Sequence, residues 1–458
     1  MRVVSYIFNS NLELPAMLEA AQAGLTMSRL SSPHIPAQTL AQKLIAKASS
    51  RSHVTPGEIV TCKVDLAMFH DSSGPRRLKP MLEELGAQIW DKSKVVLVMD
   101  HYVPEVDDES RRIVRIARDW AREQDLPHVY DSMGICHVVV AEHGHIRPGM
   151  FCVGGDSHSP TGGAFGAYMF GIGSTEMLGV VVTGEIWLRV PQTIQMVWHG
   201  VLTKGVSAKD MMLHMTGRFG MTGADYQAIE FAGSAVKALS MQERMTLCNM
   251  SAELGAQVGL IAPDATTAAW LNAAGVPAED ASNWFSDDAA PMTRHAFDAS
   301  TLAPQVAAPH SPANARDVGQ FASTAIDLAY IGACTGAKLD DLRAAASVLK
   351  GRTAASGVRL IVAPASAKDQ ATAEAEGVMQ ILRDAGAEIG ATACGACAGY
   401  GDSLAGAKNV ISSTARNFKG RMGSVDTQVY LASPYTVAAS AVAGRVCDPR
   451  DMLQKVAV

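Results

Sequence analysis

The sequence predicts an α/β fold, and three observations support this prediction. The chain has 458 residues, of which 48% are hydrophobic and 18% charged, enough for two or three domains with large cores. It contains 40 glycines and only 6% aromatic residues, a composition typical of turn-rich α/β proteins. Several short apolar runs also end in polar residues. In open α/β sheets ligands bind at the carboxyl ends of strands, so we expect the functional groups there.

The first two apolar runs place two pairs of polar residues at such strand ends. TPGEIVTCKVDLAMFHD, at residues 55–71, predicts a strand entering a loop with His70 and Asp71. SKVVLVMDHYVPE, at residues 93–105, predicts a buried strand followed by Asp100 and His101. These side chains are candidate acid-base groups. The alternative is that each of them only caps a helix or solvates a loop.

A glycine-rich stretch at residues 149–184 carries Asp156, Ser157 and His158 between a strand and a loop. Its glycines allow the backbone to approach a ligand closely. The stretch is not a dinucleotide-binding fingerprint, because the required strand, tight turn and later acidic residue are not in register. Further candidates are His137 in GICHVV and the pair Asn249 and Glu253, which are four apart and share one face of a predicted helix.

Three cysteines in the last third of the chain suggest a metal centre. Cys334 lies in IGACTG, and Cys394 and Cys397 lie in ACGACAG, each in a turn-like segment after an apolar run. A structural zinc site needs four protein ligands, whereas an iron-sulfur cubane held by three cysteines leaves one iron open. Taken alone, the CxxC pair also fits half of a zinc knuckle, a redox pair or coincidence.

The residues around these cysteines favour an anionic ligand. A turn and a predicted helix follow Cys334, which places its thiolate near a helix N-terminus. Arg416 and Arg421 flank a turn-like NFKG, and two guanidinium groups at this spacing suit a dicarboxylate.

Composition argues against several classes of partner. The net charge is −6 and no lysine or arginine cluster predicts a nucleic-acid surface. No apolar run reaches the length of a membrane span. The eight cysteines are scattered except for one pair, which predicts a reducing compartment, the cytoplasm. Residues 1–36 lack a signal or transit peptide pattern, and we interpret them as an N-terminal extension with Met27 as an alternative start.

Seven motifs, in order, carry a resemblance to a known family: VMDHYVPE, GICHVV, GGDSHSPTGGAFGA, LCNMSAELGA, IGACTG, CGAC and ARNFKGRMGS. From about residue 37 to the C-terminus, the chain resembles the aconitase superfamily. It is most similar to the large subunits of two-subunit hydro-lyases, which include isopropylmalate dehydratase, homoaconitase and the dimethylmalate and maleate or citraconate enzymes. KGRMGS and VYLASP are nearer to the homoaconitase-like and dimethylmalate-dehydratase-like branch.

The resemblance implies three α/β/α domains around a 4Fe-4S cluster, without the swivelling fourth domain of full-length aconitases. Residues 37–285 would form the first two domains and residues 321–458 the cluster-binding domain. Residues 286–320, rich in alanine and proline, would link them. The cluster ligands would be Cys334, Cys394 and Cys397. The catalytic residues would be Asp100, His101, His137, Asp156, His158 and Glu253, with Asp100 and His101, and Asp156 and His158, as acid-base pairs. The substrate-binding residues would be His70, Ser157, Asn249, Arg416 and Arg421.

The function implied is the reversible removal of water from a small 2-hydroxy di- or tricarboxylate of the isopropylmalate, homocitrate or methylmalate type. Maleate or citraconate hydration is the alternative within the family. A separate small subunit, in a heterodimer or heterotetramer, would carry the missing domain. Two alternative functions lie outside this class of enzyme: a cluster-sensing regulator that binds RNA, and a scaffold whose thiols hold a structural zinc ion.

Two positions depart from the family pattern, Gly336 and Ala415, where asparagines are usual. Because both lie beside the expected cluster or anion site, the departures could change cluster stability or substrate shape.

Overall fold

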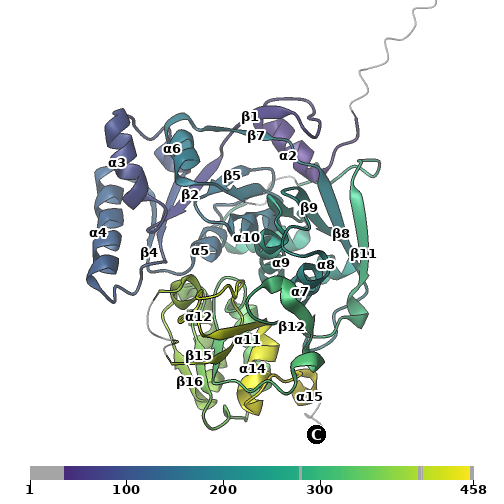
Figure 1. Cartoon of the computed structure of the whole chain (residues 1–458). Coiled ribbons are helices and arrows are strands. Elements are labelled where there is room, and N and C mark those ends of the chain that lie inside the picture. The colour runs from purple at the N-terminus through teal and green to yellow at the C-terminus, as the bar shows by residue number, and fades with distance from the viewer. Residues whose placement is uncertain (1–35, 278–280, 401–403, 405, 454–458) are drawn as a thin grey trace, which may run out of the picture. The chain divides into compact units, whose positions relative to one another are not determined.

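The computed structural model describes residues 36–277, 281–400, 404 and 406–453. The predicted N-terminal extension, except Pro36, lies outside the described residues. The remainder, from Ala37 onward, forms one compact unit. Its described strands form four sheets, and helices cover the three larger ones (Figure 1).

The first large sheet has five parallel strands, and its central strands are buried along their whole length. Such strands need apolar residues on both faces, which explains the continuous runs LAMF and VVLVM. In spatial order the strands are β4 (His128–Asp131), β3 (Val95–Met99), β2 (Leu66–His70), β5 (Phe151–Gly154) and β6 (Tyr168–Gly171). The surrounding elements are α2 (Leu40–Ala48), α3 (Pro75–Leu85), α4 (Asp108–Glu123), α5 (Cys136–Glu142), α6 (Ser174–Thr183) and the antiparallel ribbon of β1 (Ile59–Lys63) and β7 (Glu185–Arg189).

The second sheet has four parallel strands in the order β10 (Val258–Leu260), β9 (Ala228–Ala232), β8 (Thr193–His199) and β11 (Thr293–Asp298). Its helices are α7 (Ala208–Phe219), α8 (Ser234–Ala238), α9 (Met241–Asn249) and α10 (Ala265–Ala273). The 3-10 helix η2 (Ser159–Phe165) contacts strands of this sheet and of the first, and η3 (Met250–Leu254) packs against β10, α7 and α9.

The third sheet has seven strands, in the order β13 (Ala315–Asp317), β12 (Gln305–Ala307), β18 (Gln428–Ala432), β17 (Asn409–Ser412), β14 (Leu328–Ile331), β15 (Arg359–Val362) and β16 (Ala387–Ile389). The last five are parallel, and β12 is antiparallel to both of its neighbours. The helices of this part are α11 (Leu339–Leu349), α12 (Ala367–Ala375), α13 (Val378–Asp384), α14 (Pro434–Ala443) and α15 (Arg450–Leu453).

Residues 286–320, interpreted from sequence as a linker, contain regular structure. Strand β11 belongs to the second sheet, whereas β12 and β13 belong to the third. The strands β12 and β13 have three residues each, too few to show a periodicity in the sequence. The segment therefore leads from one sheet into the next.

The carboxyl ends of the first and third sheets meet. Ile135 N donates to Ala365 O at 2.8 Å, and Cys394 N donates to Asp100 O at 2.9 Å. Backbone hydrogen bonds therefore join the chain segments that follow strands of both sheets. In open α/β sheets ligands bind at the carboxyl ends of the strands, so a functional site is expected here.

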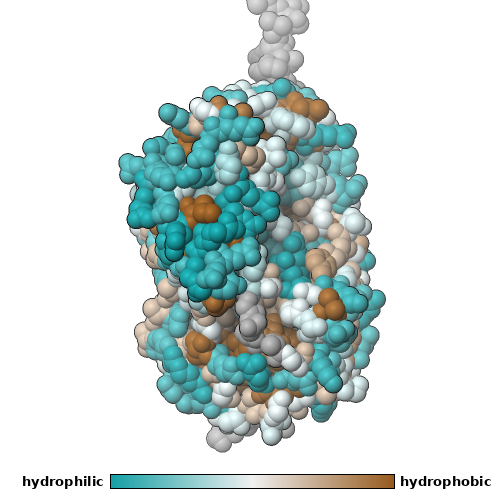
Figure 2. Space-filling view, turned by 60° about the vertical axis from the view of Figure 1, so that its left-hand side comes forward, coloured by the Kyte–Doolittle hydropathy of each residue, from teal (hydrophilic) through white to brown (hydrophobic). Residues whose placement is uncertain are grey.

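The surface is largely hydrophilic on the side that carries α3 and α4, which is turned forward in Figure 2 and shows only scattered apolar patches. Among the described residues, no helix combines the length and apolar character needed to cross a membrane.

Candidate active site

Asp100 and His101 form a buried ion pair directly after β3. His101 Nδ1 lies 2.6 Å from Asp100 Oδ1, and Cys136 N donates to Asp100 Oδ2 at 2.7 Å. Burial alone would lower the pKa of His101, but the charge and hydrogen bond of Asp100 outweigh it and raise the pKa to about 9. Burial would likewise raise the pKa of Asp100, yet His101 holds it below its usual value. At neutral pH the pair is therefore imidazolium and carboxylate.

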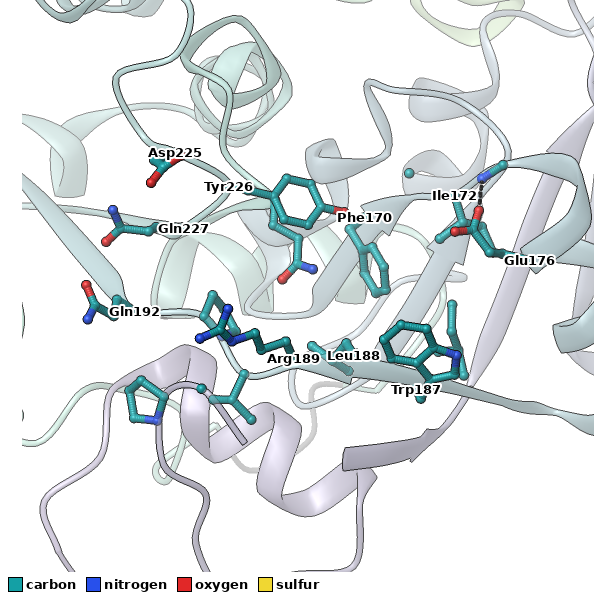
Figure 3. A pocket seen from close by; sticks show the side chains of 18 residues that line it. Phe170, Ile172, Glu176, Trp187, Leu188, Arg189, Gln192, Asp225, Tyr226 and Gln227 are labelled. Carbon is teal, nitrogen blue, oxygen red and sulfur yellow. Dashed lines mark hydrogen bonds between the residues drawn. The ribbon is translucent and has the colours of Figure 1, made fainter. Parts of the chain in front are cut away.

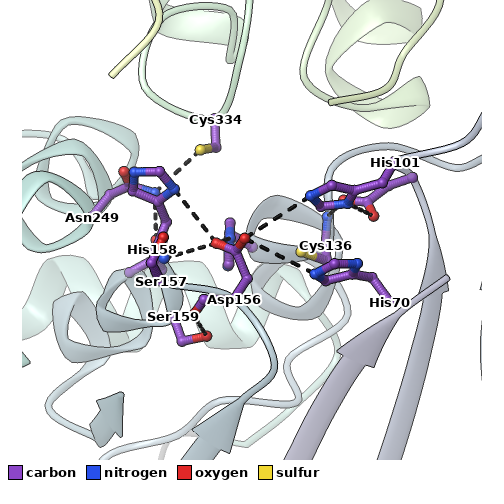
Figure 4. Close-up of polar contacts among 12 residues, drawn as sticks. His70, His101, Cys136, Asp156, Ser157, His158, Ser159, Asn249 and Cys334 are labelled. Atoms are coloured by element: carbon purple, nitrogen blue, oxygen red, sulfur yellow. Dashed lines mark hydrogen bonds and ion pairs between the residues drawn. The ribbon is translucent and has the colours of Figure 1, made fainter. Parts of the chain in front are cut away.

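His70, at the end of the neighbouring strand β2, stacks on His101 with ring centroids 3.8 Å apart and planes 10° apart. Neither ring nitrogen of His70 has a hydrogen-bond partner, although the side chain is buried. The Nε2 atoms of His70 and His101 each lie 4.0 Å from Asp156 Oδ2 (Figure 4). Three polar atoms thus face one another at a spacing that suits a small polar ligand group between them.

Asp156 follows β5 and is held by two histidines. Its Oδ1 lies 2.8 Å from His137 Nε2 and accepts the backbone N–H of His158 at 2.8 Å. Burial would raise the pKa of Asp156, but these hydrogen bonds and the charges of both histidines hold it well below its usual value. Asp156 is therefore a carboxylate.

The ring of His158 faces a different carboxylate from the one that the sequence suggested. His158 Nε2 lies 3.1 Å from Glu253 Oε1, whereas His158 Nδ1 is 3.5 Å from Asp156 Oδ1. Burial would lower the pKa of His158, but mainly the charge of Glu253 raises it to about 9. Glu253 comes from η3, 95 residues further along the chain, so motif spacing could not reveal this pair.

Arg416 joins this network from the loop after β17. Its Nε donates to Glu253 Oε1 at 2.7 Å and its Nη1 donates to Ser157 Oγ at 2.9 Å. Arg421, from the same loop, has a buried Nε without a hydrogen-bond partner. The two predicted carboxylate-binding residues therefore differ, since Arg416 is already paired and Arg421 keeps a donor free.

The three cysteines come from two loops of the third sheet. Cys334 follows β14, whereas Cys394 directly precedes η7 (Gly395–Ala398) after β16 and Cys397 lies within it. Cys334 and Cys397 are buried, and Asn249 Nδ2 donates to Cys334 Sγ at 3.2 Å. Burial raises the pKa of Cys334 to about 12, whereas the hydrogen bond from Cys394 lowers the pKa of Cys397. Burial in apolar surroundings without a metal therefore leaves Cys334 as a neutral thiol.

The residues around the thiols fit a group larger than one ion. Where three donor atoms come within 4.8 Å of one another in the described part of the chain, they belong to histidines and aspartates and include no cysteine. The buried atoms Asn249 Oδ1, Glu253 Oε2 and Arg421 Nε have no hydrogen-bond partner, although buried polar groups normally have one. This geometry gives no support to a single zinc ion held by the thiols.

Sequence reasoning missed part of the site. Ser413 Oγ accepts from Gly332 N at 2.9 Å and donates to Gly336 O at 3.1 Å, so it fastens the Cys334 turn. A Cβ atom at Gly336 would lie 2.3 Å from the Ser413 Cβ, which explains why glycine replaces the usual asparagine. Nothing in the structure explains Ala415. Two buried lysines, Lys209 and Lys338, also bind this turn.

Two pockets are candidates for a ligand, and one of them reaches these residues. One of ≈ 400 Å³ is lined by His101, Tyr102 and Tyr400 and extends to Gly395 and Ala396, between the paired cysteines. The other, of ≈ 760 Å³, lies beside the β1 and β7 ribbon and is lined by Trp187, Arg189 and Tyr226, among others (Figure 3). The second pocket contains none of the predicted site residues.

The site brings together proton-transfer groups, guanidinium groups and thiols, the residue types expected of an acid-base enzyme. A sequence profile of the aconitase family (aconitate hydratase) matches residues 42–444, and the chain belongs to this family.

The chain is 42% identical to the 3-isopropylmalate dehydratase large subunit 1 of Methanopyrus kandleri, over 91% of this chain and 100% of the relative. It is 43% identical to the probable methanogen homoaconitase large subunit of Methanosarcina mazei, over 84% and 98%. The crystal structure of Thermococcus kodakaraensis aconitase X (holo-form) shares the fold, with a TM-score of 0.50, 14% identity and coverage of 80% of this chain and 88% of that one. The predicted fold and the predicted class, a hydro-lyase large subunit, are confirmed.

Proposed function

We propose that this chain is the large catalytic subunit of a 4Fe-4S hydro-lyase that acts on a small 2-hydroxy di- or tricarboxylate. The observation that supports this most is the meeting of the Asp100 and His101 ion pair with the cysteine loop, through the hydrogen bond from Cys394 N to Asp100 O at 2.9 Å. The isopropylmalate and homocitrate types of substrate are the first to test, because the relatives carry the corresponding names. The division into residues 37–285 and 321–458 stays part of the proposal, although β11 extends the second sheet and β12 and β13 extend the third into residues 286–320.

Cys334, Cys394 and Cys397 would hold the cluster. When bound, a cluster with three cysteine ligands supplies a Lewis acid at its fourth iron. Asn249 would hydrogen-bond at its edge, since its Nδ2 already contacts Cys334 Sγ at 3.2 Å.

The chain's own residues would bind the substrate and handle protons. Removal of water transfers one proton to the departing hydroxyl and takes another from the neighbouring carbon. His101 is suited to the first task, because its Nδ1 is held by Asp100 while its protonated Nε2 faces the gap beside Asp156. Arg421, with its free Nε, and Arg416 would bind carboxylate groups of the substrate.

The second task, removal of the carbon-bound proton, would belong to a base on a separate small subunit. The family resemblance implies this partner, and the relatives are named large subunits. A cytoplasmic location fits the eight free cysteines and the need to keep the ligand thiols reduced.

The test is anaerobic co-purification of the chain with its cognate small subunit, followed by iron and sulfide analysis and a substrate panel. We expect about four irons and four sulfides per chain and turnover of a 2-hydroxy acid such as 3-isopropylmalate, homocitrate or a methylmalate. Hydration of maleate or citraconate alone would favour the alternative enzyme. One zinc per chain, or a loaded complex that dehydrates nothing on the panel, would contradict the proposal.

A further inference from the structure

Lys209, on α7, is buried beneath the two loops that meet at the cysteines. Its side chain is 1% exposed. Its Nζ donates to Ser413 O at 2.6 Å, to Thr414 O at 2.7 Å and to Thr335 Oγ1 at 3.3 Å. Thr335 follows Cys334, and Thr414 lies two residues before Arg416. One ammonium group therefore ties the turn of a predicted ligand to the loop of a predicted carboxylate-binding residue.

This ammonium group has no close counter-ion among the described residues. Its three acceptors are two backbone carbonyls and a hydroxyl, and none is charged. Burial lowers the pKa of Lys209 to about 8, and the charges of Asp341 and Glu253, which are both already paired, only partly oppose this. Asp341 binds Lys338 at 2.7 Å, and Glu253 binds Arg416 at 2.7 Å. Burying a charge without a partner is strongly unfavourable, so an anion is expected nearby.

The cysteine set is where that anion would form. Lys209 Nζ donates to Thr335 Oγ1 at 3.3 Å, and Thr335 directly follows Cys334, one of the predicted ligands. Three thiolates around a 4Fe-4S core in its resting state carry a net negative charge, and the potential of a cluster depends on the charges and hydrogen bonds around it. A cation fixed behind the loops that carry the ligands would offset this negative charge without contacting the substrate.

We propose that Lys209 is the buried counter-charge of the cluster and a positioning residue for the Cys334 turn. This inference rests on the proposed function, because it presupposes the cluster. The role is distinct from catalysis, since Lys209 donates only to the protein's own oxygens. It is also distinct from that of Lys338, whose charge Asp341 balances.

The test compares cluster properties in four variants of the full chain, each with its small subunit and purified anaerobically. Lys209→Gln removes the charge but keeps a donor, and Lys209→Arg keeps the charge. Lys237→Gln removes a charge from the exposed surface of α8 as a matched control. Ser413→Ala loosens the same turn without changing any charge. The readouts are the midpoint potential of the cluster, the rate of iron loss to a chelator, and circular dichroism of the apo protein.

We expect Lys209→Gln to have a more negative midpoint potential than wild type and to lose iron roughly tenfold faster. Lys209→Arg, Lys237→Gln and Ser413→Ala should keep the wild-type potential. An unchanged potential in Lys209→Gln, or an equal shift in Ser413→Ala, would overturn the inference. If the apo forms of both Lys209 variants fail to fold, Lys209 is a packing residue and the inference is equally wrong. A wild-type protein without a cluster would instead refute the proposed function.

Discussion

The carboxyl ends of the first and third sheets contribute opposite halves of the site. At the first sheet, Asp100 and His101 hold each other in their charged forms, with the pKa of His101 raised to about 9. At the third sheet, burial raises the pKa of Cys334 to about 12, and Arg421 Nε has no hydrogen-bond partner. Folding alone therefore completes the acid-base half. In the thiol half the pKa of Cys397 is already lowered to about 6, but Cys334 reaches its charged form only when a metal group replaces its proton.

The largest effect should come from removing a thiol ligand. We expect Cys334→Ser to lose the visible absorbance of the cluster and at least roughly a thousandfold of the activity, because the Lewis acid is lost. Cys447→Ser, at a half-buried cysteine outside the site, is the matched control and should keep both. Metal analysis and steady-state kinetics on the anaerobic complex measure the two effects. Full cluster content in Cys334→Ser would show that this thiol is not needed to hold the cluster, and would contradict the difference drawn here between the two sheets.

The acid-base half should be separable from the cluster. Asp100→Asn removes the partner that raises the pKa of His101, so proton delivery near neutral pH should fail. We expect kcat to fall roughly 10²- to 10⁴-fold while iron and sulfide content stays at the wild-type level. Loss of iron in parallel with activity would show that the two halves depend on each other.

The acid-base half should also make the stability of the apo protein depend on pH. The pKa of His158 is raised from 6.5 to about 9 by Glu253, which corresponds to a contribution on the order of 3 kcal/mol. Because the folded-state value is the higher one, this contribution is complete below pH 6.5 and is lost as the pH rises through 9.

The measurement is the difference in Tm between wild-type and His158→Gln apo proteins at pH 6 and pH 10. The difference should be larger at pH 6. A difference that does not change with pH would mean that His158 and Glu253 are not an ion pair in the apo protein.

The smallest effects concern packing. Gly336→Ala would place a Cβ 2.3 Å from the Ser413 Cβ in the buried Cys334 turn, and we expect a loss of about 1 to 3 kcal/mol in stability. Gly179, within α6 beside the first sheet, has nothing within 4 Å of an added Cβ. Gly179→Ala should therefore stabilise the protein by up to about 1 kcal/mol. Thermal unfolding of both apo proteins measures the two effects, and a tolerated Gly336→Ala would show that the turn adapts easily.

The sequence predicted one pairing of a histidine with a carboxylate correctly and missed others, because it shows only which residues are close along the chain. Asp100 and His101 are adjacent, so their pairing followed from the motif. Asp156 and His158 are also close in sequence, yet the His158 ring turns to Glu253 and Asp156 binds His137 instead. Local spacing shows which residues share a loop, but it does not show the direction of a ring.

Lys209 illustrates the same limit. It is the first residue of KDMMLHMTGRFGM, where several methionines and a leucine follow, and such a pattern predicts only core packing. Residues 286–320 are a second case, because strands of three residues give no periodicity to detect.

The sequence by itself determined the family, the α/β class and the set of cysteines, histidines and carboxylates proposed to carry the chemistry, because these depend on residue type and order along the chain. Only the tertiary structure decided which carboxylates hold His137 and His158, why residue 336 is glycine, and that the charge of Lys209 is buried beneath the cysteine loops. These features depend on contacts between residues from about 20 to more than 200 positions apart, such as Lys209 with Ser413, which form when strands and helices of separate sheets pack together.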